Sequence, residues 1–106
     1  MNGGSERPTL TVRTTEDFAA LVARGPLRMG DLRSFEAALS MAIGTGRREI
    51  VVDLRRATAV ELPIVAAIVC TAGRLQRDQR ILRVRSAGRT AGGDGVSAFT
   101  AELLAS

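Results

Sequence analysis

Three segments of the chain have the pattern of β-strands. In Thr9–Thr14 and in Ile81–Ser86, apolar residues alternate with polar ones, which places the apolar side chains on one face of a sheet. In Glu49–Leu54, the residues from Ile50 to Val52 are all apolar and β-branched. A run of this kind is typical of a strand that is covered on both faces. We therefore expect Glu49–Leu54 to lie at the centre of the sheet.

Other segments have the spacing of helices. Over Asp31–Ile43, apolar residues recur at intervals of three and four, which predicts an amphipathic helix; they are Leu32, Phe35, Leu39 and Ile43. Asp31 is placed to cap the start of this helix, and Gly44 to end it. A second helix is expected from Pro63 to about Leu75, because proline is tolerated in the first turn. A short closing helix is expected over Val96–Leu104.

Phe18–Arg24 fits both a helix and a strand, and the local pattern does not decide between them. The remaining elements alternate between strand and helix along the chain. This order predicts an α/β fold with a mixed sheet of about four strands and helices packed against it. We expect residues 1–8 to be a flexible tail and residues 9–106 to form a single domain.

The composition excludes several kinds of chemistry. The chain of 106 residues has no His, Trp, Tyr or Lys and only one Cys, Cys70. Zinc sites built on histidine and catalysis by imidazole are therefore ruled out. We therefore expect a protein that is not an enzyme and binds no cofactor. A single thiol also favours a reducing compartment, so we expect the protein to be cytoplasmic. Cys70 lies in an apolar run and is interpreted as a small core residue.

The positive charges are all arginine, 15 against 11 acidic residues, which gives a formal net charge of +4. The densest basic stretch runs from Arg74 to Arg89. A nucleic-acid-binding protein is one interpretation of this stretch, although stacking aromatic residues are scarce, and direct binding of nucleic acid is not expected. The longest uncharged run, Leu62–Gly73, is too short to cross a membrane.

This uncharged run is itself informative. A surface helix normally carries a polar stripe, whereas the second predicted helix has only small, apolar and uncharged residues over LPIVAAIVCTAG. One of its faces must pack on the sheet. The rest contacts another element or forms an apolar patch for a partner protein.

From Thr9 onward the sequence resembles the STAS family (sulfate transporter and anti-sigma factor antagonist domains) of bacterial regulators. The resemblance rests on a Gly25-Pro26-Leu27 turn before the first helix, a strand ending in Asp53-Leu54, a short connection and then the uncharged helix. It implies that Phe18–Leu27 is a strand. It also implies a non-catalytic role in transcription regulation by partner switching.

In antagonists of this family, a serine that follows an acidic residue at the start of the second helix is phosphorylated by a kinase-like anti-sigma factor. Here Glu61 occupies the acidic position and Leu62 the position of the serine. Leu62 has no hydroxyl group, so the resemblance implies that the phosphorylation switch is absent. Thr58 and Thr71 are nearby but do not align with the acceptor, and whether Thr58 replaces it is left open.

The resemblance further implies the partner-binding residues, which fall into three segments: Gly25, Pro26, Leu27, Arg28 and Met29; Glu61, Leu62, Pro63, Ile64 and Val65; and the loop of Arg89 and Asp94. The expected partner is a kinase-like anti-sigma factor or another regulatory protein, and a homodimer is left open. The alternative is a STAS module that binds a small ligand or lipid, or that docks on a membrane transporter subunit.

Overall fold

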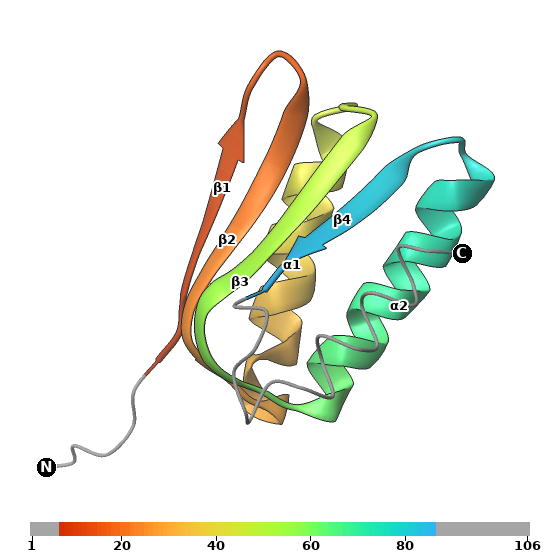
Figure 1. Ribbon diagram of the computed structural model, residues 1–106. Coiled ribbons are helices and arrows are strands. Elements are labelled where there is room, and N and C mark those ends of the chain that lie inside the picture. The colour runs from red at the N-terminus through yellow and green to blue at the C-terminus, as the bar shows by residue number, and fades with distance from the viewer. Residues whose placement is uncertain (1–6, 87–106) are drawn as a thin grey trace, which may run out of the picture.

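In the computed structural model, which describes residues 7–86, four strands form one sheet and two helices pack against it (Figure 1). The strands are β1 (Thr9–Thr14), β2 (Phe18–Leu27), β3 (Glu49–Val60) and β4 (Ile81–Arg85), and they lie in that order across the sheet. β1 pairs antiparallel with β2, whereas β2, β3 and β4 are parallel. The predicted mixed α/β fold is confirmed, and so is the prediction of a strand over Phe18–Leu27.

The two helices are α1 (Leu32–Gly44), preceded by the short 3-10 turn η1 (Met29–Asp31), and α2 (Leu62–Arg77). α1 connects β2 to β3 and α2 connects β3 to β4, so both connections step across the sheet in the same direction. Because such crossovers are right-handed, both helices lie on the same face of the sheet, where they contact each other. The opposite face is referred to below as the open face.

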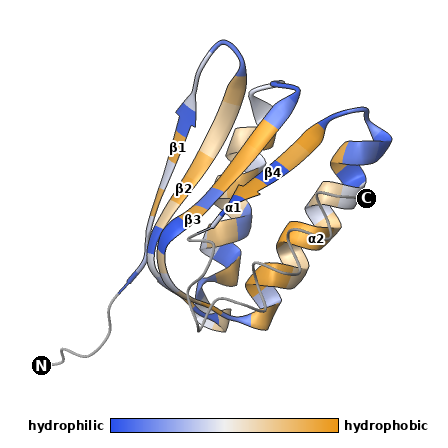
Figure 2. Ribbon diagram, viewed as in Figure 1, coloured by the Kyte–Doolittle hydropathy of each residue, from blue (hydrophilic) through white to orange (hydrophobic). Residues whose placement is uncertain are grey.

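The core lies between the helices and the sheet. Its largest fully buried side chains come from β2, β3, α1 and α2: Phe35, Leu21, Leu27, Ile50, Ile64, Ile68 and Val52. Figure 2 shows the hydrophobic character along α2 and along the first part of β3. Ile50, Val51 and Val52 are almost fully buried in an interior strand, as predicted.

β3 is longer than predicted, because it continues past Leu54 to Val60 in place of the expected short connection. β2 likewise runs through the segment expected to be a turn, Gly25-Pro26-Leu27. The register between the two strands shifts twice in this region, which marks bulges, and Gly25 adopts a φ of 86° that favours glycine. Pro26 is tolerated here because β1 pairs only as far as Arg24.

The ends of α1 differ from the expectation. The Asp31 carboxylate makes no hydrogen bond to α1; its Oδ2 instead accepts the Arg28 backbone N–H at 3.0 Å and closes η1. Gly44 is the last residue of the helix, and the chain leaves it at Gly46, whose φ is 78°. The predicted closing helix over Val96–Leu104 lies outside the described residues, and the predicted domain limits stay a prediction.

Arg80 connects three segments at one end of the fold. Its Nη2 donates to the carbonyl oxygens of Ile43 and Arg47, both at 2.8 Å, and its Nε donates to Arg47 at 3.1 Å. The next residue, Ile81, donates its N–H to the Arg48 carbonyl at 2.9 Å as β4 begins. One guanidinium therefore fixes the end of α1, the entry to β3 and the start of β4.

Asp53 is a nearly buried carboxylate on the open face. Arg55 donates to its Oδ1 from Nε at 3.0 Å and to its Oδ2 from Nη2 at 2.8 Å, and the Arg55 backbone N–H adds a third bond at 3.1 Å. These hydrogen bonds hold the pKa of Asp53 below its ordinary value, although burial acts in the opposite direction. The ionised carboxylate therefore stabilises the folded state.

We predict that Arg80→Met lowers the free energy of unfolding by about 1–3 kcal/mol, because the carbonyl oxygens of Ile43 and Arg47 lose the hydrogen bonds donated by the guanidinium. Arg48→Met is the matched control, since no hydrogen bond to the Arg48 side chain is found within residues 7–86. Urea unfolding of both variants measures the difference. Equal stability of the two variants would contradict the role of Arg80.

We predict that Asp53→Asn lowers the free energy of unfolding by about 1 kcal/mol at pH 7. The folded-state pKa is depressed, so the stabilisation is complete above the ordinary value of 3.8 and is lost as the pH falls through the folded-state value. The difference between wild type and variant should therefore shrink below about pH 4.

Urea unfolding at a series of pH values measures this change. Asp17→Asn, an exposed carboxylate with no hydrogen bond from residues 7–86, is the control and should match wild type. If the difference in unfolding free energy between wild type and Asp53→Asn stayed constant from neutral to acid pH, the stabilising role of the ionised Asp53 would be contradicted.

Candidate functional site

The first two segments predicted to bind a partner meet at the carboxyl ends of β2 and β3 (Figure 1). Leu27 and Val60 are register partners, and the Glu61 N–H donates to the Leu27 carbonyl oxygen at 2.9 Å. The chain then enters η1 after β2 and α2 after β3, and these two elements contact each other. Parallel pairing therefore joins residues that lie more than thirty positions apart in sequence.

The Glu61 carboxylate holds this junction together. Its Oε1 accepts the Met29 backbone N–H at 2.8 Å, which ties η1 to the start of α2. Asp31 closes η1 from the other side through the Arg28 N–H. Two carboxylates thus fix the backbone of a turn that would otherwise leave its N–H groups unpaired.

Two large apolar side chains are exposed at this junction. Met29 in η1 is 65% exposed, and Leu62, the first residue of α2, is 80% exposed. They flank the hydrogen bond between Glu61 and Met29, and we refer to them as the Met29–Leu62 corner. Arg28 and Glu61 are the exposed charged residues beside it.

Four of the predicted contact residues lie in the interior instead. Pro26, Leu27, Ile64 and Val65 are buried, and Leu27 and Ile64 belong to the hydrophobic core. These four side chains pack beneath the Met29–Leu62 corner in the interior and are not part of its exposed surface. Gly25 and Pro63 are half-buried, Gly25 at the bulge and Pro63 in the first turn of α2. Arg89 and Asp94 lie outside the described residues.

Leu62, at the position where the resemblance expects a phosphorylated serine, carries an apolar side chain that is 80% exposed. Of the two nearby threonines, Thr58 is exposed on β3, whereas Thr71 is only 4% exposed in the middle of α2. The hydroxyl group of Thr71 is therefore enclosed by the fold and is not accessible to a kinase. Thr58 offers a hydroxyl group on the strand and not at the helix start.

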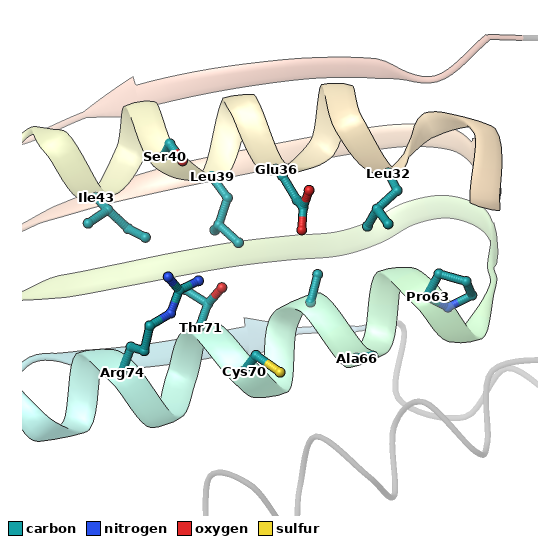
Figure 3. Close-up of a pocket in the computed structure, with 11 residues that line it drawn as sticks. Leu32, Glu36, Leu39, Ser40, Ile43, Pro63, Ala66, Cys70, Thr71 and Arg74 are labelled. Atoms are coloured by element: carbon teal, nitrogen blue, oxygen red, sulfur yellow. The ribbon is translucent and has the colours of Figure 1, made fainter.

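A second surface feature is an open groove of about 550 Å³ between α1 and α2 (Figure 3). Its walls are mainly apolar, with Glu36 and Ser40 from α1 and Thr71 and Arg74 from α2 as the polar residues; the other lining residues are Leu32, Leu39, Ile43, Pro63, Ala66, Ala67 and Cys70.

The sequence pattern does not predict this groove. Cys70 was expected in the core, but it is exposed and lines the groove. The signal was present in the small residues of the uncharged helix, Ala66, Ala67 and Cys70, which leave space that larger side chains would fill.

The basic stretch does not form one surface. Arg74 lines the groove, Arg80 binds backbone carbonyl oxygens, and Arg83 pairs with Glu49 at 2.9 Å on the sheet. Within residues 7–86, no group of three or more His, Cys, Asp or Glu side chains could hold a metal ion. The helices of this part of the chain are all too short or too polar to cross a membrane.

Comparison with known proteins places the fold. No protein-family model matches the chain, and no curated protein shows significant sequence similarity. An anti-sigma factor antagonist from Mycobacterium paratuberculosis superimposes with a TM-score of 0.77 at 14% identity, over 91% of this chain and 80% of the antagonist.

Two further solved structures are similar. The unphosphorylated form of the anti-sigma factor antagonist SpoIIAA gives a TM-score of 0.67 at 15% identity, over 86% of this chain and 83% of SpoIIAA. The protein Mglu gives 0.60 at 27% identity, over 70% of this chain but only 18% of Mglu. The chain therefore has the fold of the anti-sigma factor antagonists, which confirms at the level of the fold the resemblance to the STAS family.

Proposed function

We propose that this protein is a non-catalytic regulator that binds a partner protein at the Met29–Leu62 corner, in the manner of an anti-sigma factor antagonist. The observation that carries the proposal is the exposed Leu62 at the first position of α2, beside a carboxylate that is already bound to the Met29 N–H. Similarity of fold to two antagonists supports it.

The corner has the physical properties of a binding surface. Burying one large apolar side chain contributes roughly 1.5–3 kcal/mol, so the two exposed side chains offer a useful part of a binding energy. The hydrogen bonds of Glu61 and Asp31 order the backbone before a partner arrives, which reduces the entropy lost on binding. A preorganised apolar corner with charged residues at its rim is typical of an interface centre.

The proposed partner is a kinase-like anti-sigma factor, or another regulatory protein, in the cytoplasm. A phosphoserine next to Glu61 would add negative charge and weaken such binding by repulsion and desolvation. Leu62 keeps that position uncharged. We propose that binding is therefore constitutive and does not respond to ATP.

A second candidate function is supported by the groove between α1 and α2. Its mainly apolar walls and the guanidinium of Arg74 fit a small amphipathic ligand, as in a STAS module that binds a lipid or docks on a transporter subunit. Co-purification separates the two candidates: a kinase-like protein supports the first, and a membrane transport ATPase the second.

We predict that Leu62→Asp weakens binding to a purified kinase-like anti-sigma factor by on the order of a hundredfold, because an unpaired carboxylate must be desolvated at the interface. The fold should survive, since a helix N-terminus tolerates an acidic residue. Titration calorimetry gives the affinity and a melting curve gives the stability.

Met41→Asp is the matched control for this substitution. Met41 is also an exposed apolar residue, 65% accessible, but it lies near the opposite end of α1 from η1. The affinity of the Met41→Asp variant for the kinase-like anti-sigma factor should equal that of wild type. If a folded Leu62→Asp variant also bound like wild type, the corner would not be the partner surface, and the groove would become the leading candidate.

We predict that the kinase-like partner and ATP leave residues 61–65 without phosphate, because Leu62 has no acceptor and Pro63 restricts the backbone beside it. Mass spectrometry after incubation is the measurement, with the kinase's own phosphorylatable antagonist as the positive control. Phosphate on Thr58 would overturn the proposed loss of the switch and identify a displaced acceptor.

A further inference from the structure

The open face of the sheet carries a concentration of arginine where β2 and β3 bulge. Ala23 points into the core, so Arg24, the next residue of β2, points to the open face. The register partner of Arg24 across the sheet is Arg56. Figure 2 shows a hydrophilic stretch in β3 after its hydrophobic part.

Two more arginines join this pair. Between the paired positions Val22–Asp53 and Arg24–Arg56, β3 contains one residue more than β2, and Arg55 reaches back from this bulge to Asp53. On its other side, Asp53 is the register partner of Arg85 in β4. We refer to Arg24, Arg55, Arg56 and Arg85 as the arginine cluster.

The cluster has more positive charge than the described part of the sheet neutralises. Asp53 is the acidic residue within it, and both of its oxygens already accept hydrogen bonds from Arg55. Like charges directly opposite each other on neighbouring strands destabilise a sheet. Arg24 and Arg56 are both exposed, so the fold gains no burial in return. An anion that bridges the guanidinium groups would relieve this repulsion.

The surroundings of the cluster favour one class of anion. Phe18 and Val22 are half-buried apolar residues along the same face and form an apolar floor, whereas Ala20 and Val51 between them are buried; Phe18 is the one aromatic residue there within residues 7–86. Binding of single-stranded nucleic acid depends on several aromatic residues that stack on successive bases, whereas this face has one within residues 7–86. Guanidinium groups bind carboxylates in a bidentate manner, and an apolar floor accepts apolar side chains.

We propose that the arginine cluster and its apolar floor bind an acidic segment of a partner protein. The carboxylates of the segment contact the arginines, and its apolar side chains lie over Val22 and Phe18. This surface is separate from the Met29–Leu62 corner and does not depend on the function proposed for that corner.

The test uses the full chain and a short poly-glutamate peptide, followed by shifts of the backbone amide signals in NMR spectra. We expect the largest shifts at the arginine cluster. The double substitution Arg24→Gln and Arg56→Gln should weaken binding about tenfold, equivalent to about 1.4 kcal/mol. It should not lower the melting temperature, since it removes a repulsion.

Arg33→Gln with Arg77→Gln is the matched control, because it removes the same charge from exposed positions on α1 and α2. Its affinity should stay within about twofold of wild type. Leu62→Asp should bind the peptide like wild type, so failure of the corner and failure of the cluster are distinguishable.

Three results would overturn the proposal. Equal weakening by the control pair would mean that binding follows net charge alone. Tighter binding of a single-stranded DNA of equal charge, or of vesicles containing phosphatidylserine, would assign the face to another class of ligand. Tighter peptide binding after Asp94→Asn and Glu102→Gln would mean that acidic residues of this chain already occupy the cluster.

Discussion

Both helices lie on one face of the sheet, and this constraint determines how polar and apolar residues are distributed over the molecule. The strand order β1-β2-β3-β4 makes both parallel connections step in the same direction, so right-handed crossovers place α1 and α2 side by side. The core then forms on that face, where Leu21, Ile50 and Val52 meet Phe35 and Ile68. On the open face, the side chains of the same strands contact water, so many of them must be polar or charged.

The open face shows how the sheet meets this requirement. Val51 is almost fully buried although neither helix covers it; it lies in an interior strand, between its register partners Ala20 of β2 and Arg83 of β4. Asp53 is nearly buried on the same face and stays ionised because Arg55 supplies three hydrogen bonds. The bulge that brings Arg55 back to Asp53 also sets Arg56 opposite Arg24.

The sequence predicts the elements whose patterns depend on local burial, and it fails where distant residues decide. The β-branched run Ile50–Val52 and the apolar stripe of α1 are read correctly because each is buried on the faces its spacing implies. Phe18–Arg24 is ambiguous by pattern, since its strand form is fixed by pairing with β1 and β3. The extension of β3 past Leu54 was missed because its charged residues resemble a loop. Cys70 was misplaced because an uncharged run does not show which of its sides is covered.

The candidate site depends both on segments that the sequence identifies and on long-range contacts that it does not. The two segments were identified from the resemblance, but their union depends on the Leu27–Val60 pairing and on the bond from Met29 to Glu61, which no local pattern encodes. Because of this hydrogen bond, the role of Glu61 in shaping the turn is distinct from the role of the side chain at position 62 in contacting a partner. Glu61 acts on the backbone of η1, so its contribution to the shape of the corner is independent of the residue that follows it. Leucine at position 62 therefore adds exposed apolar surface and offers no hydroxyl group, while the hydrogen bond that shapes the corner does not involve its side chain.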